Sequence, residues 1–233
     1  TYSVDDEITL GSQAYSEMIQ NEDLQRSGPD VEMVKRVTTR IARAARERHP
    51  EIAGRFDWEV VLIEDDDVAN AWALPGGKMA VYSGILPFTQ TEDGLAVVMG
   101  HEAAHAIARH GGENMSRAGV LSVISAGTSV ALDGEYDQHI AVAGAAYGLL
   151  GEPAFSRQQE SEADEIGLFI TAQAGYDPRM AITLWQRMAE KGGGPPEFLS
   201  THPSEETRIS RLKAVMPRAM LLYRQNMKQA GNN

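Results

Sequence analysis

Most of the chain has the hydrophobic spacing of amphipathic helices. Residues 5–24 and 31–48 repeat apolar side chains every three to four positions, and the turn-forming sequence RSGPD separates the two segments. The same spacing predicts three later helices at about 153–174, 178–191 and 203–229, the last of them broken near Pro217. The pattern therefore indicates a mostly helical fold.

The region between residues 56 and 86 predicts a small sheet. Apolar and polar side chains alternate along 56–67, as in a half-buried strand, and residues 70–86 contain a Pro-Gly-Gly break followed by a second short strand. An apolar helix follows, which we expect to begin near Thr91 and to end at Gly111, where a Gly-Gly pair can cap it. We predict an α+β fold with the sheet just before this helix.

The length suits a single domain over residues 1–233. We expect residues 1–30 to form an N-terminal helical extension. Residues 112–152 are predicted to form an apolar helical hairpin packed on the core or, alternatively, a mobile or membrane-touching lid. The apolar runs inside it, at 118–132 and 140–150, are shorter than the roughly 20 residues that a bilayer requires, so we predict no transmembrane helix.

Charge and cysteine content exclude several function classes. The net charge of −12 argues against a nucleic-acid partner, which requires a basic surface, and against anchoring of the folded surface to anionic lipid. The absence of cysteine excludes disulfides, thiolate metal sites and a cysteine nucleophile, so the six histidines dominate any argument about metal. Because the chain begins at Thr1 without a methionine or a signal-like segment, we expect a mature or trimmed product whose targeting signal or membrane anchor was removed.

The apolar helix carries the sequence HEAAH at residues 101–105. His101 and His105 lie one turn apart on the same helix face, where two imidazoles can bind one zinc ion at about 2 Å from each nitrogen. Glu102 is rotated from His101 by about 100°, so it can reach a water molecule at the metal instead of binding the metal itself. The alternative is a buried helix whose histidines are satisfied by ordinary hydrogen bonds.

A third ligand is predicted in the sequence ESEAD at residues 160–164. Catalytic zinc takes three protein ligands and one open position. Glu160 and Asp164 share a helix face, so Glu160 can bind the metal while Asp164 accepts the free ring N–H of a ligand histidine. Glu162 points elsewhere on the helix and is the weaker candidate. The alternative interpretation of this segment is an acidic helix face in solvent.

The motifs HEAAH, ESEAD, NAWALPGG and THPSEETRI occur in an order that resembles the zinc metallopeptidase family of the type-one CAAX prenyl proteases and HtpX. The similarity runs from about Asp5 to Arg211 and is greatest to the soluble bacterial branch, the periplasmic β-barrel assembly-enhancing proteases, which is related to a mitochondrial inner-membrane quality-control protease. The resemblance implies that the two histidines of HEAAH and Glu160 are zinc ligands and that Glu102 is catalytic. The chain lacks the long transmembrane helices of the membrane branches, which argues against an integral-membrane role.

Several further polar residues are candidates for roles at the site. His202 lies near the end of the Gly/Pro-rich loop at 191–203, and it can donate to an oxyanion, occupy the open metal position at rest, or have no chemistry at all. Arg208 either braces this segment or the metal-bound carboxylate, or is a plain surface residue. His110 is interpreted as structural, complementing the helix dipole, and His49 and His139 as surface residues.

We therefore predict a zincin-like endopeptidase that binds one zinc ion per chain and cleaves misfolded or unassembled cell-envelope proteins. The resemblance implies a bacterial periplasmic or cell-envelope location. The strand at residues 78–86 is expected to pair with an extended peptide, or else to be an ordinary sheet edge. Two rival hypotheses remain: a latent protease in which His202 closes the site, and a zinc-bearing chaperone or binding module without turnover. The sequence gives no oligomeric state.

Overall fold

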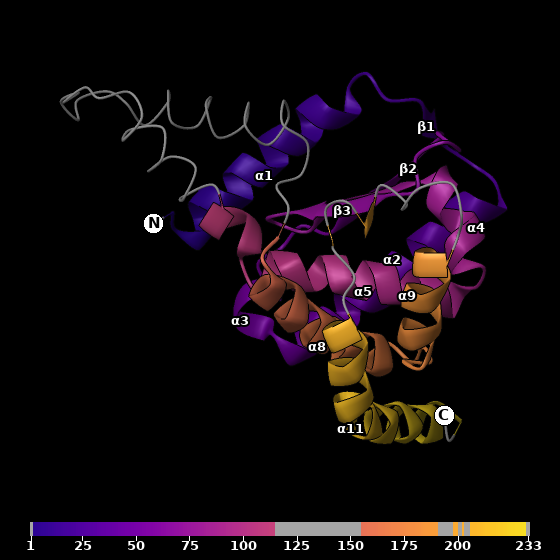
Figure 1. The fold of residues 1–233 in the computed structure, drawn as a ribbon. Helices are drawn as coiled ribbons and strands as arrows, with labels where there is room; N and C mark the ends of the chain where they lie inside the picture. The colour runs from indigo at the N-terminus through magenta and orange to yellow at the C-terminus, as the bar shows by residue number, and fades with distance from the viewer. Residues whose placement is uncertain (1, 115–154, 191–197, 200–201, 203–205, 232–233) are drawn as a thin grey trace.

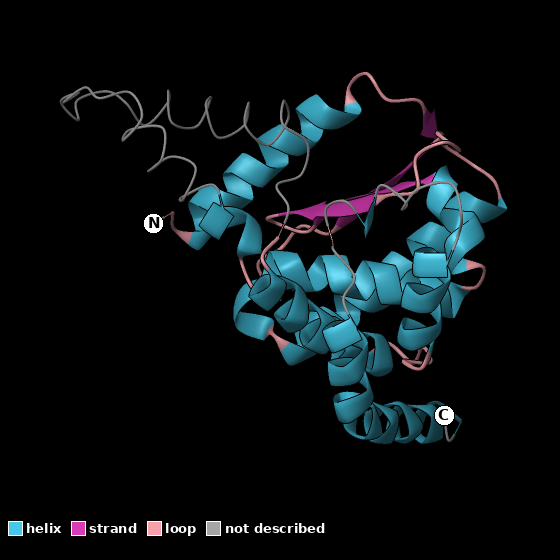
Figure 2. Ribbon diagram, viewed as in Figure 1, coloured by secondary structure: helices cyan, strands magenta, loops and turns pink. Residues whose placement is uncertain are grey.

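The computed structural model describes residues 2–114, 155–190, 198–199, 202 and 206–231. The predicted hairpin at 112–152 lies almost entirely outside these residues, as does most of the loop at 191–203. The described part is mostly helical with one small sheet, which confirms the predicted fold class (Figures 1 and 2). None of the described helices combines the length and apolar character that crossing a bilayer requires.

The helices agree closely with the hydrophobic pattern, except at their ends. They are α1 (Val4–Ile19), α2 (Pro29–Arg48), α3 (Pro50–Ala53), α4 (Leu86–Thr89), α5 (Glu92–Ile107), α8 (Arg157–Gln173), α9 (Met180–Glu190) and α11 (Glu206–Gly231), with a short 3₁₀ turn η1 at Ser83–Ile85. The first helix ends earlier than predicted because residues 24 and 25 pair with the sheet instead. The predicted break in the last helix is wrong: α11 continues through Pro217, and its axis changes direction along its length (Figure 1). Proline removes one backbone hydrogen bond and bends a helix without always ending it.

Four strands form the sheet in the order β1-β2-β4-β3: β1 (Leu24–Gln25), β2 (Glu59–Ile63), β4 (Lys78–Tyr82) and β3 (Ala71–Leu74). β2 and β4 are parallel, whereas β1 with β2 and β3 with β4 are antiparallel. Pro75 and Gly76 form the centre of the β3–β4 turn, which a 3.2 Å hydrogen bond from the Gly77 N–H to the Leu74 carbonyl closes. The φ of 89° at Gly76 suits glycine at the third position of a type II turn.

This order corrects the prediction that the strand at 78–86 pairs with a peptide. β4 is hydrogen-bonded to a neighbour on both sides, so it has no open edge. In the described part of the chain the two edge strands of the sheet are β1 and β3. The hydrophobic pattern could not show this, because β3 and β4 are equally apolar and only the pairing distinguishes them.

Helices cover both faces of the sheet (Figure 2). Ile63, Trp72 and Ala80 face α1 and form a small core with its buried Leu10 and Tyr15. The alternate positions, which belong to the main core under α2 and α5, are Leu62, Ala71, Met79 and Val81. The period-two alternation of the strands therefore divides their side chains between the two helical layers.

α5 and α8 cross at unusually short range. A Cβ atom built on Gly167 lies 2.8 Å from the Gly100 carbonyl oxygen, and one built on Gly100 lies 2.9 Å from the Gly167 carbonyl oxygen. The Thr171 hydroxyl lies 3.2 Å from the Ala96 carbonyl oxygen across the same crossing. Because both glycines lack a side chain, the backbones can approach until α8 presents its first turns to the HEAAH segment of α5.

Candidate active site

α5 is buried on all sides from Gly94 to Ile107, so its polar side chains point into the protein. The Thr91 hydroxyl caps its first turn by accepting from the Gly94 N–H at 3.1 Å. The helix begins as predicted but ends at Ile107, so the predicted cap at Gly111 is wrong. The chain turns at Arg109, whose φ of 63° is left-handed, and becomes helical again from His110.

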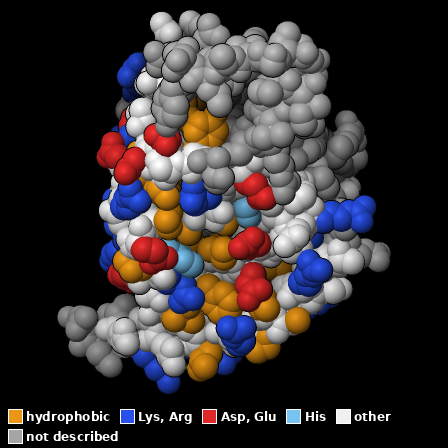
Figure 3. Space-filling view, turned by 90° about the vertical axis from the view of Figure 1, so that its left-hand side faces the viewer, with side chains coloured by type: hydrophobic (Ala, Val, Ile, Leu, Met, Phe, Trp, Pro, Cys, Tyr) orange, Lys and Arg blue, Asp and Glu red, His pale blue; other side chains and the backbone are white. Residues whose placement is uncertain are grey.

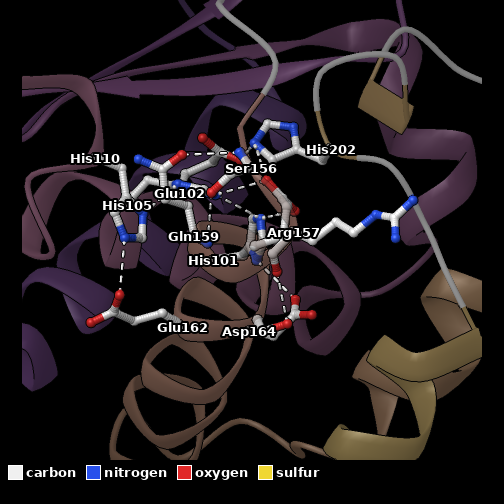
Figure 4. Close-up of polar contacts among 12 residues, drawn as sticks. His101, Glu102, His105, His110, Ser156, Arg157, Gln159, Glu162, Asp164 and His202 are labelled. Carbon is white, nitrogen blue, oxygen red and sulfur yellow. Dashed lines mark hydrogen bonds and ion pairs between the residues drawn. The ribbon is translucent and has the colours of Figure 1, made fainter. Parts of the chain in front are cut away.

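Four buried side chains converge at one place, and Figure 4 labels the three histidines among them, His101, His105 and His202. His101 and His105 from α5, Glu160 from α8, and His202 are each at most 2% exposed, and one ligand atom from each lies within 4.8 Å of the others. The Nε2 atoms of His101 and His105 are 3.1 Å apart. The Glu160 oxygens lie 3.4 Å from the His101 Nε2 and 3.3 Å from the His105 Nε2, whereas the His202 Nε2 lies 4.0 Å from the nearer one.

Asp164 and Arg208 hold His101 from behind. The Asp164 Oδ1 lies 3.1 Å from the His101 Nδ1, and the Arg208 guanidinium donates two hydrogen bonds of 2.7 Å to the same carboxylate. Arg208 also lies 2.9 Å from a Glu160 oxygen. Both residues are almost fully buried, so Arg208 is not a surface arginine but connects the two carboxylates of α8.

Glu102 lies beside the cluster and outside it. Its carboxyl is 2% exposed, lies beside the Ala73 backbone of β3, and is 3.4 Å from the His202 Nε2. Burial raises the pKa of Glu102 to about 8, against the opposing effect of His101. A carboxyl with such a pKa can both take and return a proton near neutral pH.

Ionisation within the cluster is uneven. Burial opposes charge on His101, but contacts with Asp164 and Glu160 outweigh it and raise its pKa to about 9. Burial lowers the pKa of His105 to about 3 and that of His202 well below the ordinary value. The pKa of Glu160 is lowered in spite of burial, because its carboxylate contacts His101 and His105. The cluster therefore holds one ionised carboxylate and favours positive charge beside it.

This donor set fits a metal ion. Because Asp164 can only accept when ionised, the neutral form of His101 carries its proton on Nδ1, and its Nε2 lone pair is then available to a metal on the side of the His105 Nε2. Zinc bonds of 2.0–2.1 Å in tetrahedral geometry place ligand atoms about 3.3 Å apart. The two histidine Nε2 atoms are 3.1 Å apart, and each lies 3.3 to 3.4 Å from one of the two Glu160 oxygens, which is close to that value.

His202 is packed by aromatic rings. Its imidazole stacks on Phe198 with ring centroids 4.4 Å apart, and Phe198 in turn stacks on Trp185 at 5.5 Å. The His202 Nδ1 lies 3.2 Å from the Phe198 carbonyl oxygen. His202 is therefore a fully buried residue of the site and not a histidine at an exposed helix end.

Three further residues lie at the site: His110, interpreted from the sequence as structural, Glu162, ranked there as the weaker candidate, and Phe155, not predicted from the sequence. The His110 Nδ1 lies 2.9 Å from the His105 Nδ1, its Nε2 lies 3.3 Å from a Glu162 oxygen, and Phe155 stacks on His105 with centroids 3.9 Å apart. No motif marks these contacts, because they depend on the turn at Arg109. His49 is partly buried between α2 and α3, and His139 lies outside the described residues.

Two histidines and a glutamate on one buried helix, a carboxylate from a second helix and a metal-compatible geometry together define a metal-dependent peptidase site. Residues 30–216 match Peptidase family M48, and the chain belongs to this family. Two similar proteins are the mitochondrial metalloendopeptidases OMA1 of Schizosaccharomyces pombe, 38% identical over 94% of this chain and 64% of that protein, and of Saccharomyces cerevisiae, 34% identical over 94% and 66%. The β-barrel assembly-enhancing protease of Escherichia coli is 32% identical over 64% of this chain and 32% of that protein.

These comparisons correct the predicted location. The expectation of a bacterial periplasm or cell envelope is wrong, because the relatives that align with 94% of the chain are named as mitochondrial enzymes, whereas the bacterial relative aligns with 64%. The family resemblance itself is confirmed. The chain spans 64% and 66% of the two yeast relatives, just under two thirds of their length.

Proposed function

We propose that the protein is a zinc-dependent endopeptidase that cleaves unfolded or unassembled polypeptides. The observation that carries the proposal is the mutual separation of the His101, His105 and Glu160 ligand atoms, with the Glu102 carboxyl beside them. A bound zinc ion supplies Lewis acidity, which acidifies water and polarises a peptide carbonyl.

Glu102 acts as general base and then as general acid. It takes the proton of the attacking water and returns it to the leaving nitrogen. Burial raises the pKa of this carboxyl in the metal-free protein, and a bound cation beside it would lower that pKa toward neutrality, which suits both steps. Asp164 fixes the tautomer of His101, and Arg208 holds Asp164 and Glu160 in register. The metal ligands are thereby kept in place while Glu102 changes protonation.

The substrate is proposed to extend along β3. This strand is one of the two edge strands of the described sheet, and its Ala73 backbone lies beside the Glu102 carboxyl. An extended peptide pairing there would bring its backbone to the catalytic glutamate without a demand for particular side chains. On the face drawn in Figure 3, hydrophobic side chains lie between interspersed acidic and basic ones, which suits an unfolded polypeptide.

The geometry of His202 favours a resting ligand over an oxyanion donor. A carbonyl oxygen can only accept, so the proton of the neutral ring lies on Nδ1 facing Phe198, and Nε2 presents a lone pair toward Glu102 and Glu160. A nitrogen without a proton cannot stabilise an oxyanion. We infer that His202 closes the site at rest and must leave before a substrate carbonyl can enter.

Loss of the base tests the function. In the His202→Ala background, which keeps the site open under this proposal, further substitution of Glu102→Gln should abolish casein cleavage while bound zinc, measured by elemental analysis, remains about one per chain. Cleavage by the double variant at the rate of the single one would contradict the role of Glu102. Zinc binding without casein cleavage in both the wild type and the His202→Ala variant would favour the non-catalytic binding module instead.

A further inference from the structure

His110 lies against the metal ligand His105 only because the helix is interrupted between them. In a continuous helix a residue five positions on is rotated by about 140° and would face away. The left-handed turn at Arg109 redirects the chain so that the His110 ring returns to His105. Arg109 is held there by hydrogen bonds of 3.0 and 2.7 Å to the buried Glu7 and of 2.8 Å to the Tyr2 carbonyl oxygen.

The contact between the two rings determines where their protons lie. The His105 Nε2 faces Glu160 and His101, so as a metal ligand it must present a lone pair and carry its proton on Nδ1. That proton points at the His110 Nδ1 at 2.9 Å, which must then accept. The remaining His110 proton lies on Nε2, facing the Glu162 carboxylate at 3.3 Å.

We propose that His110, oriented by Glu162, is a positioning residue that holds His105 in its metal-binding tautomer and ring orientation. This proposal rests on the metal site of the proposed function. Two carboxylates of α8 then orient the two ligand histidines: Asp164 contacts His101 directly, and Glu162 orients His105 through His110. Phe155 stacks on one face of the His105 ring.

Zinc affinity of the full chain, measured by competition with a chelator, tests the proposal. His110→Phe keeps a ring of similar size but removes the acceptor, so it should weaken zinc binding by 10–100-fold, as loss of such a partner typically does. His110→Asn places an amide oxygen near the position of Nδ1 and should restore the affinity to within a few fold. Equal weakening by Phe and Asn, or none by Phe, would overturn the proposal.

A second pair of variants avoids substitution at the buried site. Glu162→Ala should weaken zinc binding by about threefold, because water can partly replace a half-exposed carboxylate. Glu165→Ala removes an equally exposed charge from the same helix and should leave zinc affinity unchanged. Equal affinities for these two variants would overturn the role of Glu162. If His105→Ala also bound zinc normally, the metal site itself, and not only its positioning, would be contradicted.

Discussion

At the scale of single residues, the site combines groups that stabilise the fold with one that opposes it. Arg208 neutralises both Asp164 and Glu160, whereas Glu102 is buried with only partial compensation. Glu102 therefore has the clearest chemical role in the site, and it also lowers the stability of the folded state as the pH rises.

Replacing Glu102 by glutamine should stabilise the metal-free chain. The unfolded chain loses this proton near its ordinary pKa of 4.5, whereas the folded chain keeps it to about 8. Between these values the folded state binds more protons, so rising pH weakens the wild type through this group. Thermal melts in chelator should show a higher Tm for Glu102→Gln, with a gap that widens from about pH 5 to pH 8. A gap independent of pH would contradict the raised pKa.

The variant His202→Ala distinguishes the two proposed roles of this histidine, because each role predicts a change of kcat in the opposite direction. As a resting ligand, its removal should raise kcat for an unfolded substrate while zinc stays bound to the other three ligands. As an oxyanion donor, its removal should lower kcat by roughly 10²–10³. His49→Ala, a partly buried histidine between α2 and α3, is the matched control and should leave kcat unchanged.

At the scale of secondary-structure elements, the crossing of α5 and α8 places Glu160 opposite the two histidines. Gly167→Ala would bring a methyl group to 2.8 Å from the Gly100 carbonyl oxygen, so one helix must move. We expect a loss of about 1–3 kcal/mol in the free energy of unfolding, which exceeds the gain in helix propensity, together with weaker zinc binding. Urea denaturation checks this, with Glu165→Ala on the exposed side of α8 as control. Unchanged stability would show that the crossing tolerates a side chain.

The secondary-structure elements could be predicted from the sequence better than the contacts between them. Periodicity located α2, α5 and α8, and the spacing of HEAAH and ESEAD identified three of the four residues that cluster there, His101, His105 and Glu160. The turn at Arg109 could not be foreseen, because a left-handed arginine is held by a partner about a hundred positions away in the sequence. The missed contacts of His110 and Glu162 follow from that same turn.

At the scale of the whole molecule, α1 is connected to the end of the active-site helix. Glu7 is 4% exposed and accepts two of the three hydrogen bonds that the Arg109 side chain donates. Asp5, two residues earlier in the same helix, pairs with Arg55 on the surface. The same helix thus offers a buried and an exposed ion pair for comparison.

Glu7→Ala should lower the free energy of unfolding by about 2–3 kcal/mol, because it removes two charge-assisted hydrogen bonds and relaxes the turn at Arg109. Asp5→Ala should cost less than about 1 kcal/mol, since exposed pairs contribute little. Urea denaturation of both variants measures these two losses in the free energy of unfolding. The Glu7 variant should also bind zinc more weakly, because His110 is displaced. Equal losses for the two variants would contradict a special role for the Glu7–Arg109 pair.

The contact of Gly100 with Gly167 also has an evolutionary consequence. Each of these glycines leaves room for the backbone of the other helix, so neither position can gain a side chain unless the helices separate. Selection on them acts through the fold and not through the chemistry. A descendant that had lost HEAAH and become a pure binding protein should therefore keep both glycines, and the pair would still identify its ancestry after every catalytic residue had changed.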